Sequence, residues 1–169
     1  MNVIVTPFGA NEARLDWGNG ARRAAIGRGG IGVKRGEGDG VTPVGTYPLR
    51  RLFYRADRLA EPKSGLTVTA LAPDDGWCDA PVDPAYNTLI KRPYPVSSEA
   101  LWRDDHIYDL IAVIGFNDDP VVRGKGSAIF LHIARPNYSH TAGCVAMAES
   151  DLLELLALLG PRDTISIRL

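Results

Sequence analysis

One cysteine of the chain stands among residues small enough to admit a substrate. Cys144 lies in the segment His140-Thr141-Ala142-Gly143-Cys144-Val145, whose small side chains leave the backbone N–H groups before it accessible. A thiol attacks a carbonyl carbon as its thiolate, which a nearby histidine can generate. Free N–H groups beside the sulfur can stabilise the oxyanion that forms. The segment is therefore suited to covalent catalysis on an acyl group.

Three histidines are available as the base: His106, His132 and His140. His132 ends the apolar run Ala128-Ile129-Phe130-Leu131, where a polar ring is costly unless it is hydrogen bonded. The loop that follows contains proline, asparagine and serine, and can fold the chain back so that His132 meets Cys144. We therefore predict His132 as the base, His140 as a loop residue that contacts substrate, and His106 as a surface partner of neighbouring aspartates.

The residue pattern alone leaves other interpretations open. A buried core histidine beside an inert buried cysteine is the more common arrangement. A zinc site from His132, His140 and Cys144 is conceivable, although the spacing matches none of the usual paired-ligand patterns. The glycine-rich run 27–32 lacks the Gly-Lys-Ser/Thr ending of a phosphate loop, and no helix is expected after it.

Length and composition limit the class of protein. With 169 residues, 45% of them hydrophobic, the chain can bury one sizeable core, and we expect a single domain over residues 1–169. The formal net charge of −1 implies no general attraction to nucleic acid or to anionic membranes. The apolar runs 110–116 and 152–159 are far shorter than a membrane-spanning helix of about 20 residues. Cys78 and Cys144 are not expected to form a disulfide.

The N-terminal residues read as a strand rather than a secretory signal, which predicts a cytoplasmic protein, or a periplasmic one if the start is mis-assigned. Asn19-Gly20 favours a tight hairpin turn between strands at 14–17 and 22–26. Residues 27–45 contain eight glycines and predict a mobile loop before an extended segment at 46–52.

The second half of the chain predicts further strands and one firm helix. Five prolines in 73–95 predict a long ordered loop, and residues 98–103 a short helix. The apolar runs 110–115 and 127–133 predict central strands. Ser150 is expected to cap a leucine-rich helix that Gly160-Pro161 ends, before a last strand at 164–168. The predicted fold is mainly β with one or two helices.

Two motifs resemble the L,D-transpeptidase (YkuD) family. Thr141-Ala142-Gly143-Cys144 is similar to its Ser/Thr-His-Gly-Cys catalytic signature, which a histidine precedes by a short loop. The segment 37–47, with Thr42-Pro43 and Gly45, looks like the family's entry to the sheet, and the resemblance spans about residues 2–169. It implies a β-sandwich with a C-terminal helix packed on the sheet. The chain resembles the signal-less members of the family, some of which look like cytosolic L,D-carboxypeptidases.

The resemblance also implies roles for individual residues. Cys144 is the nucleophile, His132 the base, and Gly143 with the Cys144 backbone supplies the oxyanion donors; the carbonyl after His132 orients its ring. No cofactor or metal is implied. The residues expected to contact substrate are Thr141, Ala142, His140 and Arg135, with Arg28 and Arg92 as further candidates for substrate carboxylates.

The implied reaction joins Cys144 to the L-configured carbonyl of the third residue of a peptidoglycan stem peptide and expels D-alanine. Water as acceptor makes an L,D-carboxypeptidase that trims muropeptides in bacterial cell-wall recycling, which is the expected function. A second stem peptide as acceptor makes a cross-linking L,D-transpeptidase, and a catalytically silent fragment-binding domain is a further alternative. Ala142 and Ala146 replace a histidine and a polar residue of many members, and the loop from His132 to Cys144 is shorter than usual. The oligomeric state is not predicted.

Overall fold

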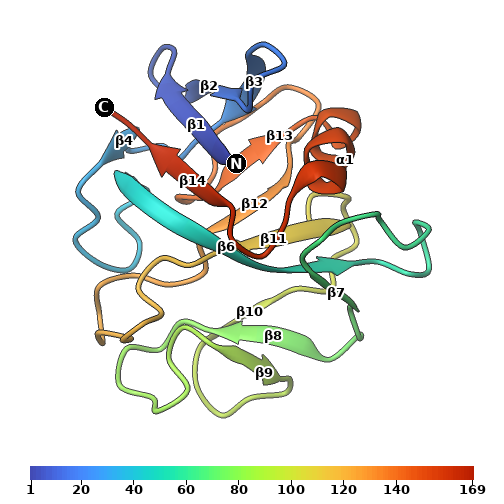
Figure 1. The fold of residues 1–169 in the computed structure, drawn as a ribbon. Helices are drawn as coiled ribbons and strands as arrows, with labels where there is room; N and C mark the ends of the chain where they lie inside the picture. The colour runs from blue at the N-terminus through green and yellow to red at the C-terminus, as the bar shows by residue number, and fades with distance from the viewer.

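Most strands of the molecule belong to one large sheet whose ends meet (Figure 1). The computed structural model describes residues 1–169. The nine-stranded sheet has the order β11-β12-β13-β3-β2-β1-β14-β6-β7, and β6 also pairs with β11, which closes the sheet into a barrel. Its strands are β1 (Asn2–Pro7), β2 (Glu12–Asp16), β3 (Arg22–Ala25), β6 (Gly45–Tyr54), β7 (Thr67–Ala70), β11 (Leu110–Ile114), β12 (Phe130–Ile133), β13 (Val145–Met147) and β14 (Thr164–Ile167).

The alternation of side chains along the barrel strands separates two apolar clusters. Leu131 and Ile133 of β12, with Val145 and Met147 of β13, point into the barrel and join a core of 25 buried residues. Phe130 of β12 belongs instead to a second cluster of 10 residues on the outer face, and this cluster includes Cys144. Strands β11 and β12 are buried throughout, so they are the central strands predicted from their apolar runs.

The single helix, α1 (Glu149–Leu158), packs its leucines onto the barrel. Leu152, Leu155 and Leu156 are buried in the barrel core, as the leucine-rich pattern predicts. The predicted cap is wrong: Ala148 occupies the cap position without a side-chain bond, and Ser150 lies inside the first turn. Glu149 and Asp151 still place negative charge at the positive end of the helix dipole. At ten residues, α1 does not reach the length of a membrane crossing.

A small three-stranded sheet lies apart from the barrel, at the lower edge of the view in Figure 1. Its strands are β8 (Asp75–Cys78), β9 (Leu89–Lys91) and β10 (Ser98–Ala100), in the order β10-β8-β9. The predictions of a long loop and of a helix at 98–103 were therefore wrong in this region. Every proline of 73–95 lies outside the strands. These prolines, which suggested one uninterrupted loop, instead flank short strands.

The glycine-rich segment 27–45 contains two short strands, β4 (Ile31–Gly32) and β5 (Thr42–Pro43), which pair in parallel. The Thr42 side chain is fully buried, and its hydroxyl accepts a hydrogen bond from the Gly27 N–H at 2.8 Å. The segment thus has regular structure where an irregular loop was predicted. The predicted hairpin is confirmed by the antiparallel pairing of β2 and β3, but its turn is wider than the tight Asn19-Gly20 turn that was predicted. Leu15 pairs with Arg22, and Gly18 and Gly20, rather than Asn19, adopt positive φ.

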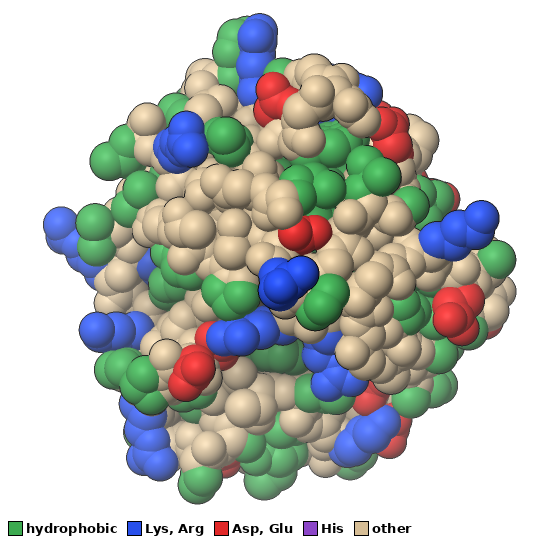
Figure 2. Space-filling model, viewed as in Figure 1, with side chains coloured by type: hydrophobic (Ala, Val, Ile, Leu, Met, Phe, Trp, Pro, Cys, Tyr) green, Lys and Arg blue, Asp and Glu red, His purple; other side chains and the backbone are tan.

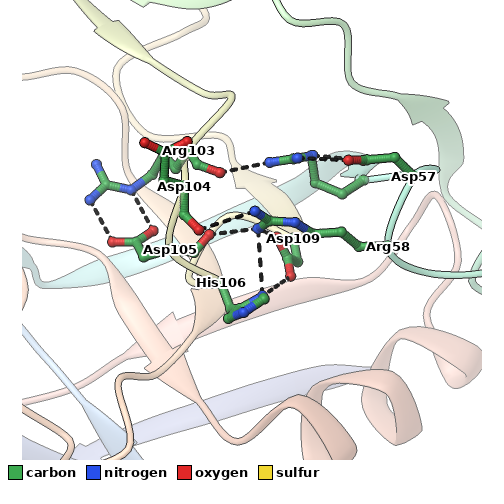
Figure 3. Close-up of polar contacts among 8 residues, drawn as sticks. Asp57, Arg58, Arg103, Asp104, Asp105, His106 and Asp109 are labelled. Atoms are coloured by element: carbon green, nitrogen blue, oxygen red, sulfur yellow. Dashed lines mark hydrogen bonds and ion pairs between the residues drawn. The ribbon is translucent and has the colours of Figure 1, made fainter.

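Charged side chains are mixed over the surface, and one group of them, centred on the buried Asp109, fixes the chain before β11. The face shown in Figure 2 carries acidic and basic residues side by side without a large region of one sign. In Figure 3, Arg58 contacts the carboxylate of Asp109 at 2.7 Å and the carbonyls of Asp104 and Asp105. His106 contacts the other Asp109 oxygen at 2.7 Å, so its partner is Asp109 rather than the adjacent aspartates. This network ties residues 103–109 to the loop after β6.

Replacing Asp109 with asparagine is expected to destabilise the protein by about 1–3 kcal/mol, because a buried charge-assisted network loses its acceptor. The Asp109 side chain is only 4% exposed, while the Arg58 guanidinium that it neutralises is 23% exposed. Urea unfolding would measure the change. Asp74→Asn, at an exposed carboxylate whose partner Lys91 is also exposed, is the control and should shift the midpoint little. Equal shifts for the two variants would contradict a structural role specific to Asp109.

Candidate active site

A pocket of about 470 Å³ opens between the outer face of the barrel and the small sheet. Its volume suits a small ligand or part of a peptide. The residues around it come from the glycine-rich segment, the small sheet, the loop before β11, strand β12 and the segment before β13. They are Lys34, Glu37, Gly38, Asp79, Glu99, Arg103, Ile107, Tyr108, Ser127, Ala128, Ile129, His132, Arg135, Thr141, Ala142 and Cys144.

Cys144 directly precedes β13 and is 6% exposed at the wall of this pocket. Its sulfur accepts the Phe130 N–H and donates to the Ala128 carbonyl, both at 3.3 Å. Burial, followed by the negative charge of Glu99, raises the pKa of the Cys144 thiol to about 12. The Phe130 N–H, Lys34 and Tyr108 oppose this shift without cancelling it. The resting form is therefore the neutral thiol.

His132 lies on the strand next to Cys144 and shares its side of the sheet. Strands β12 and β13 run parallel with His132 opposite Ala146, two residues after Cys144, so the His132 and Cys144 side chains occupy one face on a diagonal. The ring packs edge-on against Tyr108, with centroids 5.1 Å apart. Its Nδ1 lies 2.9 Å from the Ile133 carbonyl, the contact that the family resemblance implies. A carbonyl only accepts, so Nδ1 carries the proton and Nε2 keeps its lone pair.

Burial lowers the pKa of His132 to about 4, so this histidine is neutral at physiological pH. The hydrogen bond to the Ile133 carbonyl favours the charged form but only partly offsets burial. Both groups are therefore neutral in the folded chain. The structure places this thiol and this imidazole on one face of neighbouring strands, along one pocket.

The low pKa of His132 predicts a loss of stability in mild acid. Its ordinary pKa is 6.5, so between pH 6.5 and about 4 the unfolded chain binds a proton that the folded chain does not. The free energy of unfolding should fall by about 3 kcal/mol across this window from His132 alone. Chemical denaturation at a series of pH values would measure it. His132→Asn should flatten the pH dependence, whereas His140→Asn on the exposed loop should not; the same slope in all three proteins would refute the assignment.

The backbone before Cys144 is shaped by Gly143. Its φ of +142° lies in a region that favours glycine, and a Cβ at this position would come within 2.9 Å of the Val41 carbonyl. The Gly143 N–H donates to the Thr141 hydroxyl at 3.1 Å, and that hydroxyl donates to the Cys144 carbonyl at 2.7 Å. The Cys144 N–H makes no hydrogen bond within the chain. Of the two predicted oxyanion donors, the Cys144 N–H is thus free, whereas the Gly143 N–H is already bonded to the Thr141 hydroxyl.

An acidic side chain, Glu99, lines the same pocket as the sulfur. Tyr108, which is buried, donates its hydroxyl to the Glu99 carboxylate. Burial raises the pKa of Glu99, while the Tyr108 hydrogen bond and Arg103 lower it. Burial also raises the pKa of Tyr108 well above its usual value, so the phenol keeps its proton. This pair places a strong acceptor and a phenol beside both Cys144 and His132.

The other predicted substrate contacts divide between two hollows. Thr141, Ala142 and Arg135 line the pocket beside Cys144. His140 is exposed and lines an adjoining hollow with Arg28, Ser139 and the same three residues. Arg92 lines neither and packs against Gly76 of the small sheet. His140 is separate from His132, and no group of three or more potential metal ligands is arranged to hold an ion.

Several pocket residues were not singled out from the sequence: Lys34, Glu37, Glu99, Arg103 and Tyr108. Glu99 and Tyr108 are positioned by the small sheet and the network of Figure 3, which the sequence did not predict. One sequence feature could have pointed to Lys34 as a site residue: it is the only lysine in the glycine-rich segment before Thr42-Pro43.

Comparison with known proteins gives one match. The family model for the YkuD L,D-transpeptidase catalytic domain matches residues 10–167. No curated protein and no solved structure matches the chain. The matched range covers the barrel from β2 to β14, the small sheet and both residues of the Cys–His pair. The chain therefore belongs to the YkuD family of L,D-transpeptidase catalytic domains, enzymes of L,D-transpeptidase type that act on peptidoglycan.

Proposed function

We propose that this protein is an L,D-carboxypeptidase that removes the terminal D-alanine from peptidoglycan tetrapeptides through an acyl-enzyme on Cys144. The observation that carries the proposal is the shared pocket of Cys144 and His132, in which Nδ1 of the histidine is held by a carbonyl and Nε2 is left as the base. Family membership supplies the reaction type. The acceptor and the residue roles are the proposal.

In the first step the Cys144 sulfur attacks the carbonyl carbon at the L-centre of the third residue, and His132 Nε2 takes the thiol proton. The oxygen of the tetrahedral intermediate takes the electron pair of the carbonyl and accepts the free Cys144 N–H. Collapse breaks the C–N bond, and the imidazolium returns the proton to the amine of D-alanine. Water then attacks the thioester with His132 again as base, releasing the tripeptide and the thiol.

Cations around the pocket fit a peptide with a free terminal carboxylate. Arg103 and Arg135 line the same pocket as Cys144, and guanidinium groups suit bidentate contacts with carboxylates. Arg103 already holds Asp105 at 2.7 and 2.8 Å, whereas Arg135 makes no ion pair. Arg135 therefore has the free guanidinium for the carboxylate of the leaving D-alanine.

Water is the favoured acceptor because two positions near Cys144 in the sequence lack the polar side chains that many members of the family carry there. Ala142 and Ala146, on either side of the cysteine, present no polar group, and Ala146 is buried. A bound amine acceptor needs contacts that orient it over the thioester. Without them, water reaches the acyl-enzyme first.

The test is mass spectrometry of a tetrapeptide ending in D-alanine after incubation with the purified protein. Loss of one alanine residue to give tripeptide, without dimers, is the expected result. Cys78→Ala, which removes the buried thiol outside the pocket, is the matched control and should give the same products. No product with the wild type would overturn the proposal.

Cross-linking is the second candidate, favoured by the family to which the chain belongs. Dimers, or exchange of D-alanine for an added D-amino acid, would establish it in place of hydrolysis. The proposal includes soluble muropeptides as substrates, as cell-wall recycling requires. Faster release of D-alanine from a soluble muropeptide than from intact cell-wall sacculi is the expected result, and the reverse preference would contradict it.

A further inference from the structure

A buried lysine lies at the cysteine end of the pocket and has no assigned role. Lys34 follows β4 in the glycine-rich segment, lines the pocket, and its side chain is only 3% exposed. Lysines are almost never buried to this degree unless they are paired. Its Nζ contacts Asp39 Oδ1 at 2.6 Å and the Val41 carbonyl at 3.2 Å.

An ionised partner, Asp39, holds the Lys34 ammonium in place. Burial alone would raise the pKa of Asp39, but the Lys34 ammonium and the N–H groups of Val41 and Arg35 outweigh it and lower that pKa to about 2. Asp39 is therefore ionised at every physiological pH. An ammonium has three N–H donors, and Asp39 and the Val41 carbonyl accept two of them. One donor is left for another acceptor.

The remaining donor is near the backbone that carries the nucleophile. A Cβ built on Gly143 would lie 3.4 Å from Lys34 Nζ, which places the ammonium against the residue directly before Cys144. The Lys34 charge is also one of the influences that lower the pKa of the Cys144 thiol against burial. Lys34 thus lies against Gly143, the residue whose peptide bond carries the free Cys144 N–H.

We propose that Lys34 is a further catalytic residue, whose ammonium stabilises the negative charge that passes from the Cys144 sulfur to the oxygen of the tetrahedral intermediate. The inference rests on the cysteine chemistry proposed above. As the S–C bond forms and the carbonyl electron pair moves to oxygen, Lys34 keeps its proton and donates a hydrogen bond to the oxygen. A fixed charge in a water-poor site needs no reorganisation during the reaction. Lys34 takes the place of the Gly143 N–H, which Thr141 engages.

The experiment compares how fast iodoacetate and iodoacetamide alkylate Cys144, because a cation at the thiol favours the anionic reagent. A Cys78→Ala background leaves Cys144 as the only thiol. In this background Lys34→Met should lower the iodoacetate-to-iodoacetamide rate ratio about tenfold and move the pH midpoint of alkylation upward. It should also lower kcat for D-alanine release about 100-fold, the size expected for one oxyanion donor. Lys63→Met, at an exposed lysine outside the pocket, is the control and should change none of these.

A purely structural role for the Lys34–Asp39 pair makes a different prediction. Rates with both reagents would then change together, and the pH midpoint would not move. Asp39→Asn removes the ion pair but keeps the ammonium, so it should retain the preference for iodoacetate and decides the matter if Lys34→Met fails to fold. Loss of the preference in Asp39→Asn, or its persistence in folded Lys34→Met, would overturn the proposal.

Alkylation also separates this inference from the proposed function. It reads the charge beside the thiol whether or not a tetrapeptide is cleaved. A charge-dependent alkylation rate without release of D-alanine would support Lys34 and refute the carboxypeptidase. Release of D-alanine with no effect of Lys34 on alkylation would support the carboxypeptidase and refute the role of Lys34.

Discussion

Cys144→Ala is expected to lower the rate of D-alanine release by roughly 10⁵-fold, to a level set by residual binding effects. The variant removes the only thiol in the pocket, and no other nucleophilic side chain there has a histidine on the same face of the neighbouring strand. The Cys144 sulfur makes two hydrogen bonds at 3.3 Å within an apolar cluster, so its loss should also lower stability, by far less than it lowers activity. Steady-state assay of released D-alanine, with urea unfolding in parallel, checks both statements.

Cys78→Ala provides the matched comparison for this variant. Cys78 is equally a buried free thiol, but it belongs to a separate apolar cluster in the small sheet. The Cys78→Ala variant should keep the wild-type kcat. Its midpoint of unfolding can fall, because truncation of a side chain in a packed cluster leaves a cavity. Substantial activity in Cys144→Ala, or equal losses in the two variants, would remove Cys144 from the mechanism.

His132→Ala is expected to lower kcat/KM by roughly 10³-fold, within the range of general base catalysis. The loss is smaller than for Cys144→Ala, because the small thiolate fraction present at neutral pH still attacks. The wild-type kcat/KM should persist into acid and fall only below pH about 4, where the imidazole becomes protonated. Measuring kcat/KM at a series of pH values shows this acid fall directly.

Removal of the imidazole should also change the shape of the pH profile. In His132→Ala the rate should rise with pH as the Cys144 thiol ionises, and the acid limb of the wild type should disappear. His140→Ala is the control, because His140 lies on the exposed rim of the adjoining hollow. An unchanged profile in His132→Ala would exclude this histidine as the base, whatever the size of the rate loss.

Local sequence patterns predicted the barrel better than the small sheet. Gly18 and Gly20 supply the positive φ angles of the β2–β3 hairpin turn, and the leucines of 152–156 specify a helix face through their spacing. The strands β8, β9 and β10 have at most four residues each, too few to show a period between prolines. Their stability comes from pairing and from burial of Trp77 against Phe130 of the barrel, contacts that no local pattern records.

The residues of the candidate active site also divide into those that local sequence reveals and those that only the tertiary fold brings together. Cys144 and His132 are recognisable because one is framed by small residues and the other interrupts an apolar run, and the family motif joins them. Lys34, Glu99 and Tyr108 reach the pocket from three separate parts of the chain. Their side chains have ordinary neighbours in the sequence, so only the tertiary fold shows that they surround the sulfur.

The way the barrel closes bears on how the chain reaches its native state during synthesis. Strand β14 lies between β1, with which it pairs in parallel, and β6, so Asn2 meets Thr164 across nearly the whole chain. Such distant contacts carry a large loop-closure entropy and slow folding. The ring cannot be completed until residue 167 has emerged from the ribosome, and until then β1 and β6 expose unpaired edges. Until this last strand docks, the chain therefore presents strand edges that can pair with other chains.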